Sequence, residues 1–553
     1  MIATSLHPEH SRFALGPSLA WASAGLPTVA LVVVLLVARL AYLAFWCPYT
    51  LIEDEGHYWE WSRHLDWSYY SKGPGVAWTL WLTTHAFPAL GEFSIRCAAP
   101  FFHAITTLAL ATLASDAFKD RRIGFLTAVI FNLLPGFQIA GMLFVIDMPY
   151  AACWSLAMLL AYRAFFAGAG ISWLALGAVL ALGFIYKYTI ILLIPGLAHT
   201  LFWDRDRLVL ARGWRFLAAA CLFIACIGLV PVGIWNAQHD WPTIKHLLGH
   251  LGVEGGDTPV VQGAGKGWSY NPMWTLDFLI AQFGISGPIL LLALAACRPG
   301  TWNTPHGELG RRFILWCGAP IVIFYLLVSL VTEPEGNWSI AAHLSVAPLA
   351  AALVVQTLDR VSIQIVARFN PVRFLWHLSM ILGVLAGVVM LRLDWIDRGL
   401  EAVGASDSVR RIVPMSRLSG ADLQAAHVSR LLADLPSNAF VMTKHYGRAS
   451  QMAYYLPSQP RVYCASAYLD NGRRTQYDVW HFTDLSNQAT ARELLGRDAV
   501  VMGGTLSDWQ PLFNSVREVG TLDGDRKRGR PAFIALGYKG LPIPPSGGSG
   551  ANP

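Results

Sequence analysis

Apolar runs long enough to cross a membrane recur between Leu26 and Leu393, separated by short polar segments. A helix of about 20 residues spans the hydrocarbon core of a bilayer, which is about 30 Å thick. The runs predict a polytopic α-helical membrane protein, and a composition of 54% apolar and 14% charged residues supports this. We expect eleven spans, at residues 26–47, 95–115, 123–141, 148–166, 172–186, 188–203, 216–235, 275–296, 313–331, 339–357 and 374–393.

The net charge of +6 bears on orientation, because most Lys and Arg residues of this region lie in short loops between apolar runs. Loops rich in Lys and Arg are retained in the cytoplasm. This distribution predicts a cytoplasmic N-terminus, an outer location for residues 48–94 and an outer C-terminus. Binding to nucleic acid is not expected. The first span is too long for the apolar core of a cleaved signal peptide and is expected to be a retained anchor.

The composition changes after the last apolar run, which divides the chain into a membrane domain (1–395), an outer α/β domain (396–541) and a disordered tail (542–553). In the outer domain we expect helices at 422–435 and 447–456, and strands at 439–443, 461–465, 499–502, 516–522 and 532–537.

The first outer loop contains the segment EDEGHYWEWSRHLDWSYYSKGP, residues 53–74. Asp54 and Glu55 lie where the first span leaves the membrane, and Asp147 lies at the same depth before the fourth span. Carboxylates so close to hydrocarbon tend to face a cavity or a partner, so these three acids are candidate catalytic residues. The alternatives are an aromatic belt with ordinary interfacial charges and, for Asp147, the N-cap of a helix.

Two lysines are candidate phosphate ligands. Lys187 is flanked by apolar residues in GFIYKYTIILLIPG, and Lys72 follows the acidic pair in YYSKGP. A cation at such a position can bind a phosphate that enters from the lipid, or it can extend to the headgroups with no further role. The candidates for lining a substrate cavity are His57, Tyr58, Tyr70, His239 and Glu335.

No motif predicts a bound metal, nucleotide or other cofactor. Several histidines lie in the outer loops, but no HExxH motif occurs, and His246 and His250 alone are a weak metal signal, so a divalent metal is possible but unsupported. The outer loops also include the apolar stretch 76–90, expected to lie along the membrane surface, and the Gly-rich stretch 252–267, expected to be flexible.

Several segments together resemble one family: DEGHYWEWSRHLDWSYYSKGP, IDMP, GFIYKYT, WNAQHDWPTIKHLLGH and RRTQYDVW. They resemble the bacterial branch of the protein O-mannosyltransferase family, which is similar to the aminoarabinose transferase of lipid A and has the GT-C membrane fold. The resemblance implies that Asp54, Glu55 and Asp147 line a periplasmic cavity, with Lys72 and Lys187 near a lipid phosphate. The chain has Lys-Gly-Pro where many members have Lys-Pro-Pro, which leaves the geometry of that turn open.

The function implied is that of an inner-membrane glycosyltransferase. It would move a sugar, with inversion, from a polyprenyl phosphate to lipid A, another glycan or a protein on the periplasmic face. Asp54 would act as the general base, Asp147 would orient the acceptor or stabilise positive charge on the sugar, and the two lysines would stabilise the leaving phosphate. The alternatives are a lipid or sugar transporter that uses the same charged cavity, and an interaction scaffold built on the outer domain.

Overall fold

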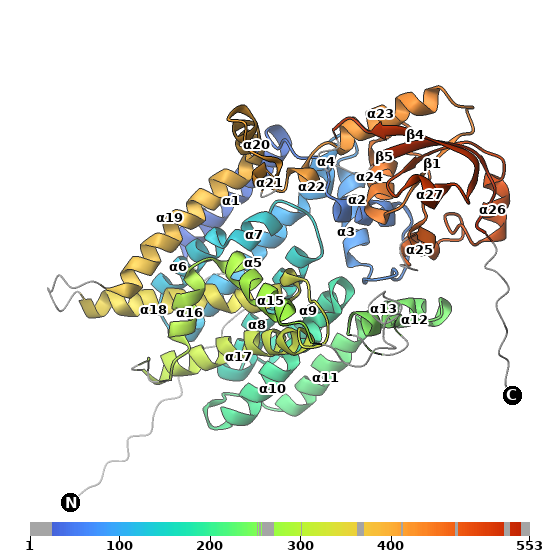
Figure 1. Ribbon diagram of the computed structural model, residues 1–553. Coiled ribbons are helices and arrows are strands. Elements are labelled where there is room, and N and C mark those ends of the chain that lie inside the picture. Colours follow the sequence, from blue (N-terminus) through green and yellow to red (C-terminus); the bar gives the residue numbers. More distant parts are fainter. Residues whose placement is uncertain are drawn as a thin grey trace, which may run out of the picture.

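The computed structural model describes residues 25–251, 253, 256, 270–299, 301–302, 304–361, 370–410, 413–469, 474–524 and 531–542. Helices fill one part of the molecule and an α/β domain forms the other (Figure 1). The predicted flexible stretch 252–267 lies outside the described residues apart from Val253 and Gly256, and so does the predicted tail apart from Pro542, leaving both predictions untested.

Six helical segments in the described part of the chain are long and apolar enough to cross a membrane. A seventh span arises if the bent pair α15 (Pro272–Ser286) and α16 (Ile289–Ala296), which meet at 100°, counts as one. The six are α1 (Leu26–Phe45), α4 with α5 (Glu92–Arg96, Ala98–Phe118), α11 with α12 (Trp214–Ile227, Val230–Gln238), α17 (Pro305–Val328), η3 with α18 (Gly336–Ser345, Val346–Val361) and α19 (Pro371–Leu391).

The remaining predicted spans are helical but shorter, broken or less apolar. The span predicted at 123–141 is interrupted before Pro135, whose ring restricts the preceding residue and whose nitrogen has no hydrogen to donate. Lys187 separates two short apolar helices, as predicted. The polytopic helical fold is therefore present, whereas the count of eleven spans stays a prediction. These helices are α6 (Arg121–Leu133), α7 (Pro135–Ala140), α8 (Asp147–Phe166), α9 (Gly170–Tyr186), η1 (Tyr188–Leu192) and α10 (Leu193–Trp203).

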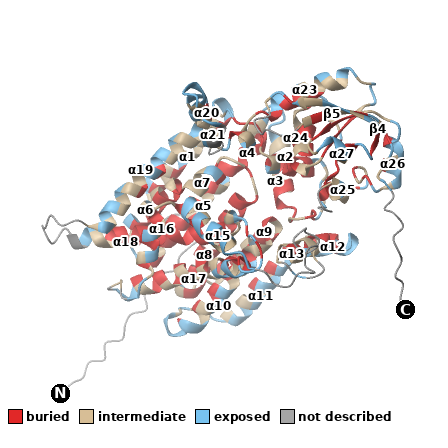
Figure 2. Ribbon diagram, in the orientation of Figure 1, coloured by how far each residue is buried: buried red, intermediate tan, exposed pale blue. Residues whose placement is uncertain are grey.

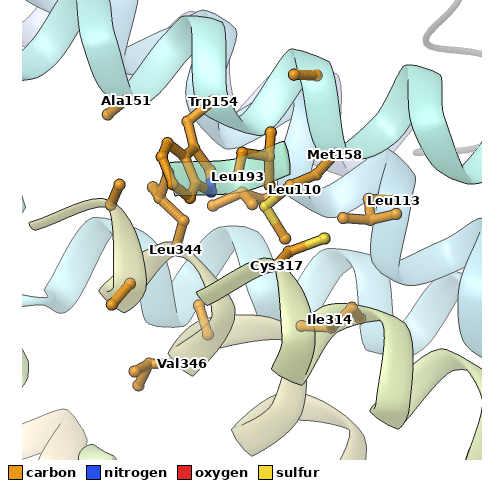
Figure 3. Packing of buried hydrophobic residues seen from close by; sticks show 14 of the residues in the cluster. Leu110, Leu113, Ala151, Trp154, Met158, Leu193, Ile314, Cys317, Leu344 and Val346 are labelled. Carbon is orange, nitrogen blue, oxygen red and sulfur yellow. The ribbon is translucent and has the colours of Figure 1, made fainter. Parts of the chain in front are cut away.

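The core of the helical part lies around α5, α8, α17 and α18. Trp154 of α8 is fully buried among apolar side chains that include Leu110, Cys317 and Leu344 (Figure 3). Many residues of α1, α11 and α19 are instead exposed (Figure 2), and large apolar residues are among them. A buried core surrounded by apolar outer faces is the arrangement expected of helices that face lipid.

The outer domain contains a five-stranded sheet in the order β2-β1-β3-β5-β4. Strand β1 (Phe440–Thr443) is parallel to β2 (Val462–Cys464) and β3 (Ala499–Met502), while β5 (Pro531–Tyr538) is antiparallel to β3 and to β4 (Phe513–Thr521). The five predicted strands and both predicted helices, α23 (Ala421–Ala433) and α24 (Tyr446–Tyr455), are present. The short elements around them are α20 (Leu393–Ala402), α21 (Asp407–Arg410), α22 (Met415–Leu418), α25 (Ser466–Leu469), η4 (Gln476–Asp478), α26 (Gln488–Leu494) and α27 (Leu506–Trp509).

The outer domain packs on α2 (Glu53–Arg63), which lies beside α24 in Figure 1. Two glycines permit this contact, because a Cβ on Gly447 would lie 2.4 Å from the Cβ of Glu53, and one on Gly56 would lie 3.4 Å from the backbone of Ser450. A loop connects α2 to α3 (Gly75–Ala86), the helix formed by most of the apolar stretch 76–90. Two further short helices lie in loops: α13 (Pro242–His250) in a loop predicted to lie outside, and η2 (Arg205–Arg207) in a loop predicted to be cytoplasmic.

Candidate active site

Asp54 lies in the first turn of α2, immediately beyond the segment that follows α1. Water reaches its side chain, and its carboxylate forms no hydrogen bond or ion pair with any described residue. The surrounding protein desolvates the carboxylate and raises the pKa of Asp54 to about 6, a shift that Lys72 opposes and that Glu53, Asp147 and Glu55 reinforce. This carboxylate is ionised at neutral pH and can still accept a proton, as a general base must.

Glu55 is fully buried, and its carboxylate accepts hydrogen bonds from other groups of the protein. Arg96 donates from Nη2 to Oε2 at 2.6 Å and from Nε to Oε1 at 2.9 Å. The backbone N–H of Ile52 donates to Oε2 at 3.1 Å, and that of Phe144 donates to Oε1 at 3.0 Å. Glu55 therefore fastens the start of α2 to the segment that precedes Asp147.

Asp147 is the first residue of α8, and its two carboxylate oxygens are held by two different segments. Lys187 donates from Nζ to Oδ1 at 2.8 Å, and Asn337 donates from Nδ2 to Oδ2 at 2.9 Å. The ammonium of Lys187 also lies 5.2 Å from the ring centre of Tyr150. Lys187 and Asp147 are both nine-tenths buried, so their charges compensate one another in a region poor in water.

Lys72 lies in the loop between α2 and α3 and is half-buried. Its ammonium forms no ion pair with any residue that the structure describes. Burial, together with the positive charge of Lys187, lowers the pKa of Lys72 to about 8, while Asp54 and Asp147 act in the opposite direction. The four charged groups predicted from the sequence thus share one electrostatic environment, in which Lys72 is the cation open to an anionic ligand.

Two glycines bring the Lys72 loop against the end of α9. A Cβ on Gly73 would lie 2.4 Å from the carbonyl oxygen of Ile185, and one on Gly75 would lie 2.8 Å from the ring of Tyr186. Because Lys187 follows directly, this close backbone approach places the two lysines together. In this chain, the glycine of the Lys-Gly-Pro turn is therefore required by contact with α9.

Tyr58 and His57, on adjacent positions of α2, have different surroundings. The pKa of Tyr58 is raised well above its usual value by burial and by Asp54, Tyr446 and Asp147, which places this neutral phenol beside the acids. His57 lies instead against the outer domain, with Nδ1 at 3.1 Å from Oγ of Ser450. Burial lowers the pKa of His57 to about 3, so the imidazole is neutral.

The other three predicted cavity residues are spread around the Lys72 loop and η3. Tyr70 is buried in this loop, with its ring centre 4.9 Å from that of His246. His239 is exposed at the end of α12 and stacks on Trp235, with ring centres 4.4 Å apart. Glu335 is exposed immediately before η3, two residues from the Asn337 that holds Asp147.

Arg96, Asn337 and Gln476 were not predicted from the sequence as site residues. Arg96 lies 41 positions from Glu55, and Asn337 lies 190 positions from Asp147. Gln476 of the outer domain accepts a hydrogen bond from the backbone of Tyr70. Their sequence signals were weak: Arg96 adjoins an apolar run, Asn337 lies in the polar segment EPEGNWS between two spans, and Gln476 lies in RRTQYDVW, one of the segments that carry the family resemblance.

Metal-ligand geometry is not found in the described ranges, where no three or more His, Cys, Asp or Glu side chains are grouped to bind an ion. His246 and His250 place their Nε2 atoms 3.0 Å apart, which is a hydrogen bond between two imidazoles. The charged groups that the site does offer are therefore carboxylates and ammonium groups, which suit proton transfer and binding of an anion.

Comparison with known proteins begins with residues 71–235, which match the family model described as dolichyl-phosphate-mannose-protein mannosyltransferase. The matched segment includes Lys72, Asp147 and Lys187. The lipid A galacturonosyltransferase RgtD of Rhizobium johnstonii is 27% identical over 313 residues, which are 54% of this chain. The alignment spans 60% of the length of RgtD.

Among solved structures, ArnT of Cupriavidus metallidurans in the apo state superimposes with a TM-score of 0.56 at 17% identity, covering 92% of this chain and 97% of ArnT. The ArnT structure bound to undecaprenyl phosphate gives a TM-score of 0.57 at 18% identity, with coverages of 94% and 99%. This chain has the GT-C fold. The predicted resemblance to protein O-mannosyltransferase-like glycosyltransferases is thereby confirmed. In this GT-C chain, the membrane helices and the outer domain both align with ArnT.

Proposed function

We propose that this protein is an integral membrane glycosyltransferase that moves a sugar from a polyprenyl phosphate to a hydroxyl group of lipid A. The similarity to a lipid A galacturonosyltransferase supports a lipid acceptor, and the fold shared with an undecaprenyl phosphate-bound protein supports the donor. The predicted orientation, with eleven spans and the outer domain in the periplasm, places the reaction on the outer face of the inner membrane. Another glycan or a protein is the alternative acceptor. The sugar that the donor carries is a hexose or a pentose.

The observation that carries this proposal is that Asp54 and Lys72 share one environment and that neither is paired with another described residue. Each has a charged group that lacks a described protein partner, and they influence each other's pKa. An unpaired charge in a partly desolvated site lowers the stability of the fold, because no partner compensates for the lost hydration. Such groups are therefore candidates for binding or reacting with a ligand. One acid and one cation side by side fit a reaction that releases a proton at one oxygen and negative charge at another.

In the proposed reaction, Asp54 takes the proton from the acceptor hydroxyl as its oxygen attacks the anomeric carbon of the sugar. The bond between that carbon and the phosphate oxygen breaks, and its electron pair leaves with the polyprenyl phosphate. Lys72 stabilises the negative charge that develops on this phosphate. Attack on the face opposite the leaving group inverts the configuration. No further energy source is needed, since the donor bond is already activated.

Asp147 and Glu55 differ from Asp54 in this scheme. Both oxygens of Asp147 are engaged by Lys187 and Asn337, so we assign it to orienting Lys187 and to shaping the field around the sugar. Glu55 is engaged by Arg96 and two backbone N–H groups, so we assign it to positioning Asp54, not to proton transfer. Lys187 contributes a second positive charge near the phosphate, partly offset by Asp147.

The test is mass spectrometry of envelope lipids and glycans from cells with and without the protein. The proposal predicts that one sugar substituent of lipid A is lost without the protein and returns when the gene is restored. A transporter would instead leave no sugar missing from the envelope glycans and change the distribution of polyprenyl-linked sugars across the membrane. That second result would contradict transfer and favour the transporter.

A further inference from the structure

The loop that carries Lys72 is held from the outer domain as well as from the helical part. The backbone N–H of Tyr70 donates to Oε1 of Gln476 at 2.6 Å. Gln476 opens the short helix η4 and is 1% exposed, so this contact is shielded from water. Since the donor is a backbone N–H, the side-chain atom that faces it must be the amide oxygen.

The position of Tyr70 determines the position of Lys72, because the intervening chain is a closed turn. The backbone N–H of Tyr69 and the hydroxyl of Ser68 both donate to the carbonyl oxygen of Lys72, at 3.1 and 3.2 Å. On the opposite side, the hydroxyl of Thr243 donates to the carbonyl oxygen of Tyr69 at 3.2 Å. The turn is thus held between α13 and the outer domain, and Gln476 binds it at its central residue, Tyr70.

The nitrogen of the Gln476 side-chain amide indicates why a glutamine is buried here. Its Nε2 is buried without a hydrogen-bond partner among the described residues. An unpaired buried amide nitrogen lowers stability, and an apolar residue of similar size would not incur this loss. A glutamine at this position is therefore explained by what its oxygen does for the loop.

We propose that Gln476 is a positioning residue for the donor site, through which the outer domain sets Lys72 against the phosphate of the polyprenyl donor. This inference rests on the proposed function. In this arrangement Gln476 does not contact the donor, and the outer domain acts on the phosphate site through the position of Lys72. A purely structural role for Gln476 would affect folding and leave the affinity for the phosphate unchanged.

Three variants of the full-length protein separate these possibilities. Gln476→Leu keeps the approximate size and removes the accepting oxygen, whereas Gln476→Glu keeps an oxygen that can accept from Tyr70. Thr490→Val is the matched control, because Thr490 is equally buried in the outer domain and its hydroxyl donates to the carbonyl oxygen of His481, away from the loop. Thermal unfolding of all three variants reports their structural cost.

The experiment measures binding of undecaprenyl phosphate to the protein in lipid nanodiscs between pH 6 and pH 10. We expect Gln476→Leu to weaken binding about tenfold at pH 7, the effect of one lost hydrogen bond, and to raise the pH at which binding declines, because a released Lys72 is better hydrated. Gln476→Glu should bind as the wild type does at pH 7, and Thr490→Val should match the wild type throughout.

Equal affinity and equal pH dependence for Gln476→Leu and Thr490→Val would overturn the inference, whatever their melting temperatures. So would a Gln476→Glu variant as weak as Gln476→Leu. A wild-type protein that does not bind undecaprenyl phosphate would contradict the proposed function itself. A wild type that binds while Gln476→Leu is unaffected would contradict only the role of Gln476.

Discussion

The guanidinium of Arg96 and the carboxylate of Glu55 form a buried two-point ion pair, with neither side chain more than 1% exposed. Arg96 also donates to the carbonyl oxygens of Tyr49 and Thr50, at 2.8 Å each. The pair therefore ties the segment after α1, the start of α2 and the end of α4 into one unit. Asp54, adjacent to Glu55, takes its position from that unit.

Replacing Arg96 by leucine should strongly destabilise the protein, because the charge of Glu55 is left buried without a partner. The expected loss in the free energy of unfolding is about 3–5 kcal/mol. Thermal unfolding in detergent measures it, with Arg461→Leu as the control, because both side chains of the Arg461–Glu493 ion pair are exposed. Glu55→Gln, which keeps the side-chain shape, should be inactive only to the extent that it is unstable. A stable but wholly inactive Glu55→Gln variant would show that Glu55 serves the reaction beyond its contribution to stability.

Replacing Gly73 by alanine should weaken binding of undecaprenyl phosphate by about tenfold or more. The added methyl would overlap the carbonyl oxygen of Ile185 and push Lys72 away from Lys187, and overpacking of this kind costs about 1–3 kcal/mol. Gly233→Ala is the control, since a Cβ there meets nothing within 4 Å. Unchanged affinity in Gly73→Ala would mean that the approach of the loop to α9 does not matter for the phosphate.

The pH dependence of kcat/KM should be bell-shaped. Activity requires ionised Asp54 and protonated Lys72, so it should rise through about pH 6 and fall through about pH 8. In Lys72→Arg the alkaline decline should disappear, because arginine stays charged. Initial rates across pH 5 to 10 measure both limbs. An alkaline decline that persists unchanged in Lys72→Arg would assign it to another group.

Asp54→Asn should make the protein more stable at neutral pH. The pKa of Asp54 is about 6 in the folded state and near 3.8 when unfolded, so the folded state binds more protons between those values. Stability from this group is therefore lost as pH rises through that window, and the asparagine variant escapes the loss. We expect its melting temperature to exceed that of the wild type at pH 7.5 and to match it near pH 4. A lower melting temperature at pH 7.5 would contradict the raised pKa of Asp54.

Much of the architecture was predictable because it follows from local patterns. Apolar runs predict membrane helices, and short β-branched segments predicted all five strands of the outer domain. The breaks in those helices were harder to predict. The interruption at Pro135 and the 100° bend between α15 and α16, at Gly287 and Pro288, occur at residues that break helices, and a count of apolar residues does not contain that information.

The candidate site was predictable to a similar degree. Position along the chain indicated Asp54, Asp147, Lys72 and Lys187, and the structure brings these four charges together. The sequence could not indicate which carboxylates are already occupied. Glu55 and Asp54 are neighbours of similar chemistry, and only contacts from Arg96, distant in sequence, distinguish their surroundings.

The central claim is that Asp54 is the base in sugar transfer, and one measurement tests it most directly. Purified Asp54→Asn in nanodiscs is assayed for transfer of the wild type's sugar to lipid A and for binding of undecaprenyl phosphate. Asp277→Asn, which changes an exposed acid of α15, is the control. We predict a loss of transfer of at least about a hundredfold with binding retained. Transfer by Asp54→Asn at the rate of the control would contradict the claim.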